Sequence, residues 1–102
     1  MLDMIQKLGE LKQKMEESKQ RLEAVTVSGS AGDGAVTVTL TGNKKFKSIF
    51  IEDAMCLPER KEELTDYIEI AFAKALDAAQ DISDKEMMAQ GQGLLPNLPG
   101  LF

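Results

Sequence analysis

The chain contains no histidine and only one cysteine, Cys56, among its 102 residues. Without histidine, the usual zinc sites, the Ser-His and Cys-His nucleophile pairs and the commonest general base are excluded. One cysteine cannot form an intrachain disulfide, and we interpret Cys56 as a small structural thiol. The sequence therefore predicts a protein that is not an enzyme, with no catalytic residues, no metal site and no cofactor.

Long apolar runs are also missing. The segment Met1–Ile5 has an early acid and no basic stretch, so we expect neither a secretory signal nor a membrane span, and a cytoplasmic location. Apolar residues make up 43% of the chain and charged residues 28%, which is ordinary for a globular protein. A chain this short has room for one domain, and a second copy is an efficient way to complete its core.

Residues 1–24 carry a seven-residue repeat that predicts an amphipathic helix. With Met1 at position a, the a and d positions form a narrow apolar seam: Met1, Met4, Leu8, Leu11, Met15, Ser18, Leu22 and Val25. The e and g positions beside it hold five basic residues, here called the basic rails: Lys7, Lys12, Lys14, Lys19 and Arg21. Two such helices would set like charges against each other in a simple coiled coil, so we expect the seam to pack within a larger dimer.

After this helix the apolar residues alternate with polar ones, which is the period of a half-buried strand. The alternation predicts strands over residues 25–28, 36–41 and 46–51. The glycine-rich stretch 29–34 and the pair Gly42-Asn43 supply the turn residues between them. A three-stranded antiparallel meander is therefore expected.

A broader apolar stripe predicts a second helix from about residue 59 to 90 that packs on the sheet. Its alanines permit a close approach of backbones: Ala71, Ala73, Ala75, Ala78 and Ala79. We expect Gly91-Gln92-Gly93 to end this helix, because two prolines follow soon after. The predicted organisation is one α+β domain over residues 1–90 and a flexible, apolar Gly/Leu/Pro-rich tail over 91–102. Two interpretations of the tail stay open: a docking peptide for a partner protein, or a disordered terminus with incidental packing.

Three segments together carry a resemblance to a known family. They are the charged helix with the hairpin Val25–Val38 (Val-Thr-Val-Ser-Gly-Ser-Ala-Gly-Asp-Gly-Ala-Val-Thr-Val), the strand exit Ile49–Asp53 (Ile-Phe-Ile-Glu-Asp), and the tail Gly93–Phe102 (Gly-Leu-Leu-Pro-Asn-Leu-Pro-Gly-Leu-Phe). In this combination, and over essentially its whole length, the chain resembles the YbaB/EbfC nucleoid-associated proteins of bacteria.

The resemblance implies a homodimer with a tweezer-like outline, in which the sheets and the following helices form the body and helices project as arms. It also implies DNA binding with little sequence preference, in the nucleoid of the bacterial cytoplasm. The family offers no catalytic residues and no short DNA-contacting motif to place on this chain. Candidate contacts must therefore come from the placement of charge.

Charge is distributed unevenly along the chain, whose net charge is −5. Residues 1–24 carry five basic and five acidic side chains, residues 25–51 carry three and one, and residues 52–102 carry four and eleven. An acidic total opposes approach to a phosphate backbone at long range. At physiological salt the Debye length is about 8 Å, so a local basic group can act while distant acids are screened.

Two groups of residues are dense enough in positive charge to be DNA-binding candidates. They are the basic rails and a second group, here called the turn lysines: Lys44, Lys45 and Lys47. The rails have an alternative role, in which their stems lie along the seam and their charges pair with acids of the second helix. The turn lysines have one too, as charges that keep an edge strand from pairing with other sheets.

The leading hypothesis is a homodimeric nucleoid-associated protein that contacts the phosphates of double-stranded DNA. Such binding should be weak, steeply salt-sensitive and largely indifferent to sequence. The alternative is a non-catalytic adaptor that docks a protein partner through the acidic second helix or the tail, which suits the negative net charge better.

Overall fold

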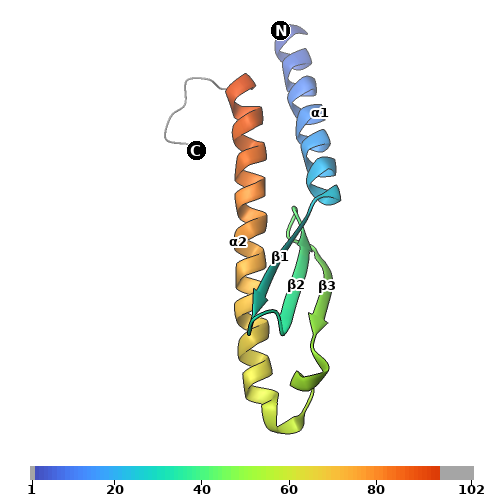
Figure 1. Ribbon diagram of the computed structural model, residues 1–102. Coiled ribbons are helices and arrows are strands. Elements are labelled where there is room, and N and C mark those ends of the chain that lie inside the picture. Colours follow the sequence, from blue (N-terminus) through green and yellow to red (C-terminus); the bar gives the residue numbers. More distant parts are fainter. Residues whose placement is uncertain (1, 95–102) are drawn as a thin grey trace.

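The computed structural model describes residues 2–94, with side chains for residues 2–89. In chain order its elements are α1 (Leu2–Ala24), β1 (Thr26–Ala31), β2 (Val36–Thr41), β3 (Phe46–Ile51), the 3-10 helices η1 (Asp53–Met55) and η2 (Pro58–Arg60), and α2 (Lys61–Leu94). This order confirms the predicted α+β class. The predicted tail falls largely on residues 95–102, which lie outside the described residues. As Figure 1 shows, α1 and the C-terminal half of α2 extend beyond the sheet at the same end of the molecule.

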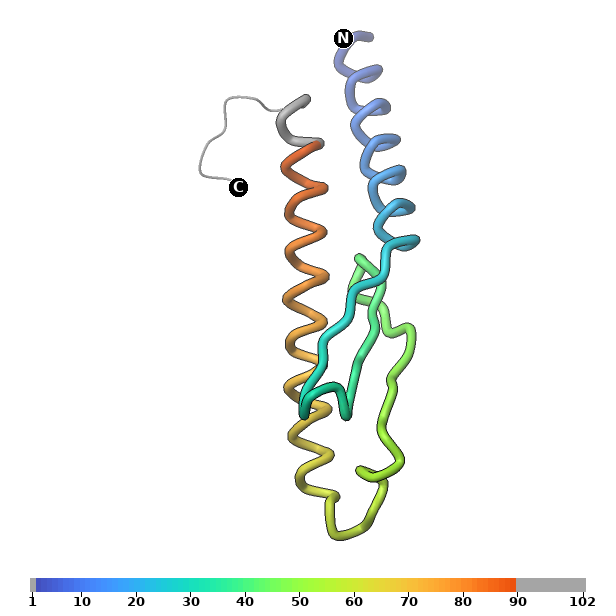
Figure 2. The backbone as a smooth tube through the Cα atoms, in the orientation of Figure 1, coloured from blue at the N-terminus to red at the C-terminus, as the bar shows by residue number. Residues whose placement is uncertain are grey.

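The strands form one antiparallel sheet in the order β1-β2-β3, as predicted (Figure 2). Val38 of β2 lies opposite Gly29 on one side and Ile49 on the other. The register between β2 and β3 shifts at Leu40, which lies opposite Phe46. Residues opposite each other share a face of the sheet, so Phe46 and Ile49 of β3 point to the same side as the apolar residues of β2.

The core lies between α2 and the first two strands. It contains six buried residues: Ala31, Val36, Val38, Leu40, Ala71 and Ala75. Three of the five alanines predicted for a close approach, Ala71, Ala75 and Ala79, have no exposed surface and bring the backbone of α2 close to the sheet. The other two do not lie on the buried face, since Ala73 is exposed and Ala78 is only partly buried. The third strand, β3, lies at the edge of the sheet. Its residues are mostly exposed, because α2 packs on β1 and β2.

The interpretation of residues 29–34 as a loop was wrong for its first half. Gly29 and the next two residues continue β1, and the turn occupies Gly32–Ala35, closed by a 3.1 Å hydrogen bond from the Ala35 amide to the Gly32 carbonyl. Gly29 is needed for a close approach instead of a turn. A Cβ atom there would lie 2.4 Å from both the carbonyl oxygen of Ala71 and the amide nitrogen of Ala75. The missing side chain is what allows α2 to lie directly on β1.

The end of α2 also differs from the prediction. The helix continues through Gly91 and Gly93 to Leu94. A glycine inside a helix costs about 1 kcal/mol relative to alanine but does not forbid the conformation. Proline disfavours the helical conformation of the residue before it, so Pro96 is the stronger signal in the sequence for the end of a helix. None of the described helices is long and apolar enough to cross a lipid bilayer.

A polar cluster secures the start of α2 beneath the β1–β2 turn. The Arg60 guanidinium donates to both carboxylate oxygens of Glu63, at 3.1 and 2.9 Å, and to the carbonyl of Ala54 at 2.9 Å. A hydrogen bond from Tyr67 to Glu63, together with the negative charge of Glu63, raises the pKa of the Tyr67 phenol. A Cβ on Gly32 would lie 2.5 Å from the Tyr67 ring, so this cluster holds the turn against α2.

Replacing Glu63 with glutamine should lower the pKa of Tyr67, because the charge that opposes ionisation of the phenol is removed. Tyr67 is the only tyrosine and the chain has no tryptophan, so phenolate absorbance reports this group alone. In the unaltered protein the raised pKa means that the folded state holds the phenol proton more tightly than the unfolded state. The free energy of unfolding should therefore fall as the pH rises above about 10. The exposed Glu59→Gln is the control, and an equal effect of both substitutions on the titration would contradict the prediction.

Candidate nucleic-acid interface

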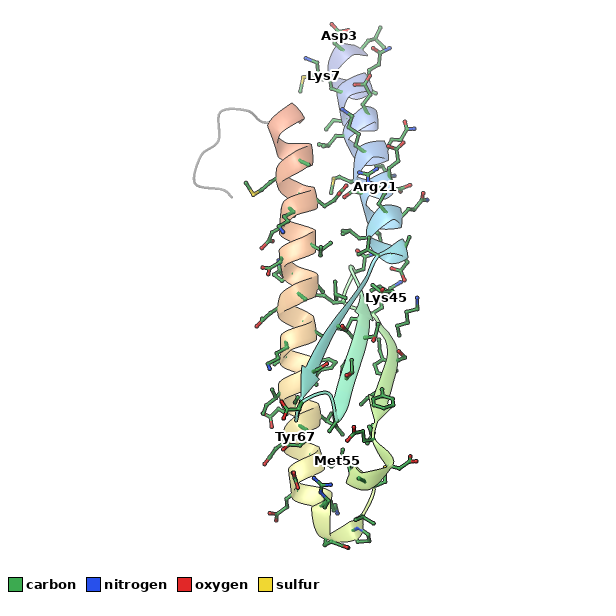
Figure 3. All side chains as sticks on the ribbon, viewed as in Figure 1. Asp3, Lys7, Arg21, Lys45, Met55 and Tyr67 are labelled. Carbon is green, nitrogen blue, oxygen red and sulfur yellow. The ribbon has the colours of Figure 1, made fainter. Side chains whose placement is uncertain are left out.

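The basic rails lie on α1, and all five side chains are exposed. Four of them form no ion pair with any residue of the part that the structure describes: Lys7, Lys12, Lys14 and Lys19. Arg21 differs, because its Nε donates to Glu86 of α2 at 2.9 Å and a second guanidinium nitrogen pairs with the same carboxylate. In Figure 3, Arg21 points from α1 toward α2 while Lys7 lies near the far end of the helix. Pairing with acids of the second helix therefore occurs for Arg21 and not for the four lysines.

The turn lysines follow the turn between β2 and β3 and are exposed. Lys45 lies 3.7 Å from a Glu23 carboxylate oxygen, and Lys44 donates to the side-chain oxygen of Gln80. Lys47 forms neither an ion pair nor a side-chain hydrogen bond within residues 2–89. An exposed ion pair of this kind contributes at most about 1 kcal/mol, so Lys45 remains available to a phosphate.

The C-terminal end of α1 is fastened to this turn, so the turn lysines lie beside the Lys19 end of the rails, whereas Lys7 lies at the far end of the helix (Figure 3). The side-chain nitrogen of Asn43 donates to the carbonyl of Lys19 at 2.9 Å and to the carboxylate of Glu23 at 2.8 Å. The amide of Gly42 donates to the carbonyl of Leu22 at 2.9 Å. We call this set of contacts the α1 joint. The bond from Asn43, followed by the smaller effect of Lys45, lowers the pKa of Glu23.

Sequence reasoning missed two of the residues that shape this surface. The sequence pattern marks Asn43 only as a turn residue and does not distinguish Glu86 from the other acids of the second helix. The first is 24 residues from Lys19 and the second 65 residues from Arg21. No local pattern could have indicated either partner, because both contacts depend on where α1 lies after folding.

Large apolar surfaces accompany the charges. On α1 the seam is open over most of its length, with Leu8 63% and Met15 62% exposed, and only Leu22 buried. On β3, Phe46 is 61% exposed and Phe50 is 56% exposed. The two rings lie on opposite faces of the sheet, because the register shift places Phe46 opposite Leu40 and Phe50 opposite Thr37. The expectation that the seam packs within a larger assembly stays a prediction, since this single chain leaves it uncovered.

Comparison with known proteins places the chain among relatives. A model of the YbaB/EbfC DNA-binding family matches residues 1–94. A nucleoid-associated protein of Flavobacterium johnsoniae is 35% identical over 101 residues, covering 99% of this chain and 93% of the relative. Another from Alkaliphilus metalliredigens is 36% identical over 102 residues, covering 100% of this chain and 88% of the relative. The chain belongs to the YbaB/EbfC DNA-binding family.

A solved structure supports the fold of this YbaB/EbfC chain. An uncharacterized protein from Helicobacter pylori matches with a TM-score of 0.70 and 20% sequence identity, covering 80% of this chain and 84% of that one. At this identity the match speaks for the fold alone. The YbaB/EbfC family is described by DNA binding and its curated relatives as nucleoid-associated, with no catalytic activity in either description.

Proposed function

We propose that this YbaB/EbfC protein binds double-stranded DNA in the bacterial nucleoid, through phosphate contacts from the basic rails and the turn lysines. The observation that carries the proposal is the state of the α1 lysines. Four cations line one exposed helix, and none forms an ion pair with a carboxylate of residues 2–89. Lysines in this state are available to phosphates, whose condensed counterions they release on binding.

The negative net charge does not oppose this proposal at short range. Most of the excess acid lies in residues 52–102, whereas the turn lysines fall in the segment 25–51, which has a net positive charge. Phosphates that approach α1 and the β2–β3 turn would meet the local lysines within a Debye length of about 8 Å, and the acids in the sheet-covering half of α2, which lie farther from α1 (Figure 1), would be screened. The interaction should therefore be weak at high salt and free of base readout.

A homodimer is part of the proposal, and the exposed apolar residues support it. Phe46 and Ile49 of β3 lie on the face of the sheet that α2 covers elsewhere, yet they are 61% and 40% exposed. Apolar surfaces of this kind on a small domain are typical of subunit interfaces. A dimer would present every basic group twice. Sedimentation equilibrium should give twice the chain mass at micromolar concentration, and a monomer there would contradict the proposed assembly.

The test of DNA binding is fluorescence anisotropy with several duplexes of unrelated sequence, measured between about 50 and 200 mM salt. All duplexes should bind with similar affinity, and the logarithm of the association constant should fall linearly with the logarithm of salt concentration. No binding to any duplex at the lowest salt, by protein that is folded, would overturn the proposed function.

Replacing Glu86 with glutamine should increase DNA affinity about three- to tenfold, because Arg21 loses the carboxylate that competes with phosphate for its guanidinium. The pair is exposed, so its loss should lower the free energy of unfolding by less than about 1 kcal/mol. Asp81→Asn is the matched control, since it removes one exposed acid from α2 without releasing a rail residue. Equal gains in both variants would show that net charge matters and the Arg21 pair does not.

The exposed acids of α2 favour a second candidate function, a protein-binding adaptor that docks its partner on this helix. This helix carries exposed acids with no cationic partner within the described residues: Glu62, Asp66, Glu69, Asp77 and Asp81. A basic partner could dock there, and the tail at 91–102 could contribute. A pull-down that loses the same partner on charge reversal of α2 or on deletion of 91–102 would support this role.

A further inference from the structure

The α1 joint is a narrow support for a long helix. Among the described residues, the hydrogen bonds and ion pairs that link α1 to other elements all involve Lys19 or residues after it. Leu22 is the one buried residue of the helix. Within this chain, the polar contacts that orient the segment before Lys19, which holds Lys7, Lys12 and Lys14, therefore all lie at its C-terminal end.

Small rotations at such a support produce large displacements of the rails. Lys7 precedes Lys19 by 12 positions, which is about 18 Å along a helix. A rotation of about 10° at the joint would move Lys7 by about 3 Å. This displacement is close to the whole length of a hydrogen-bonded ion pair, so phosphate contacts made by the correctly placed helix would be lost.

Asn43 has the chemistry that this joint requires. Its amide nitrogen carries two N–H donors, and the two bonds that it makes go to a carbonyl and to a carboxylate. An aspartate at position 43 would place a carboxylate oxygen next to both acceptors, which would repel it instead of accepting a hydrogen bond. The turn is itself ordered, because the Thr41 hydroxyl oxygen accepts from the amides of Asn43 and Lys45 at 3.2 Å each. The joint thus connects α1 to a defined turn that also bears the turn lysines.

Gly42 allows the same contact from the neighbouring position. A Cβ on Gly42 would lie 2.8 Å from the carbonyl oxygen of Leu22 and 3.2 Å from its Cα. Both atoms belong to the backbone of α1, so they cannot move without moving the helix. A side chain at position 42 would act as a wedge between α1 and the turn.

We infer that Asn43 is a positioning residue for DNA binding, which fixes the angle of α1 so that the rails and the turn lysines meet phosphates of one duplex together. The inference rests on the proposed function and deepens it. Asn43 itself contacts no phosphate in this arrangement. It acts through Lys19 and Glu23, and Gly42 permits the approach.

The test compares three substitutions that leave the net charge unchanged. Asn43→Ala removes the two hydrogen bonds, Gly42→Ala inserts the wedge, and Gln13→Ala on the exposed side of α1 is the control. The first two should weaken DNA binding about tenfold and make its salt dependence less steep, because fewer phosphates are contacted at once. A residue that only stabilises the fold would leave that slope unchanged in protein that is still folded by circular dichroism.

A reciprocal exchange provides the rescue. Asn43→Asp alone places two carboxylates together and should weaken binding further. Combined with Glu23→Gln, it restores a hydrogen bond between positions 23 and 43 with donor and acceptor exchanged, at the net charge of the unaltered chain. The double variant should therefore bind DNA more tightly than Asn43→Asp and recover part of the salt slope. If only net charge mattered, the double variant would not recover the salt dependence of DNA binding.

A distance measurement separates failure of this inference from failure of the proposed function. Nitroxide labels on Gln6→Cys and Thr65→Cys, in a Cys56→Ser chain diluted with unlabelled protein, report the angle between α1 and α2. The distribution of distances should broaden in Asn43→Ala and stay narrow in Gln13→Ala. An unchanged distribution, or unchanged DNA affinity and slope in Asn43→Ala, overturns the inference. If the unaltered protein does not bind DNA, the proposed function is overturned, and so is the role of Asn43 in DNA binding. The distance measurement would still show whether Asn43 fixes the angle of α1.

Discussion

Changing Lys7, Lys12, Lys14 and Lys19 together to glutamine should abolish detectable DNA binding at physiological salt and weaken it at least about 100-fold at low salt. If each lysine of a dimer neutralises one phosphate, the salt slope should fall by about seven, since each contact contributes about 0.9. Glutamine forms helices about as well as lysine, so α1 should remain intact. Anisotropy over a range of salt concentrations measures both the affinity and the slope.

The necessary control separates local placement from total charge. Lys7→Gln with Lys14→Gln removes two charges from the rails, and Lys61→Gln with Lys74→Gln removes two from the sheet-covering half of α2. Because Lys74 also donates to the Ser30 carbonyl at 3.2 Å, circular dichroism should first establish that the α2 pair is folded. The rail pair should lose far more affinity than the α2 pair. Equal losses would mean that DNA responds to net charge, and the rails would then not be the interface.

Gly29→Ala should be strongly destabilising, lowering the free energy of unfolding by about 3 kcal/mol. The added carbon would lie 2.4 Å from two backbone atoms of α2 and 2.7 Å from Cβ of Lys74. Helix backbone cannot yield as the tip of a side chain can, so α2 would have to lift from β1 and lose core contacts. Since small domains are stable by only about 5–15 kcal/mol, a larger side chain such as valine should prevent folding.

Gly9→Ala is the matched control for this effect. Position 9 lies in α1, and a Cβ there would meet nothing within 4 Å. Alanine should therefore stabilise the protein by about 0.5–1 kcal/mol through its higher helix propensity. Urea denaturation followed by circular dichroism measures both variants. A Gly29→Ala protein whose unfolding free energy lies within 1 kcal/mol of the unaltered chain would show that α2 does not lie directly on β1.

Features that depend on neighbouring residues could be predicted from the sequence. The heptads placed α1 correctly, the alternation at Val36–Thr41 and Phe46–Ile51 placed β2 and β3, and the alanine stripe identified the buried face of α2. The family was recognised because three local segments occur together. Each of these signals is a periodicity or a motif contained within one stretch of chain.

Long-range partners could not be predicted in the same way. Glycine serves both in turns and where backbones approach closely, and only the position of α2 shows that Gly29 belongs to the second class. The ion pairs of the basic rails could not be predicted either, because the sequence does not show which cation lies next to an acidic side chain after folding. The fold pairs Arg21 with Glu86 and leaves four lysines without such a partner in residues 2–89.

The sequence by itself thus determined the two long helices, the three strands, their order and the candidate basic groups, since backbone conformation and amphipathic faces follow from residues close together in the chain. It did not give the end of β1 or of α2, nor the two 3-10 helices. Tertiary structure alone decided how α2 lies on β1, how Asn43 holds the base of α1, and which charges remain open to a ligand. These depend on packing and hydrogen bonds between segments 20 or more residues apart. Such contacts have no counterpart in local pattern, because they arise only when the elements meet.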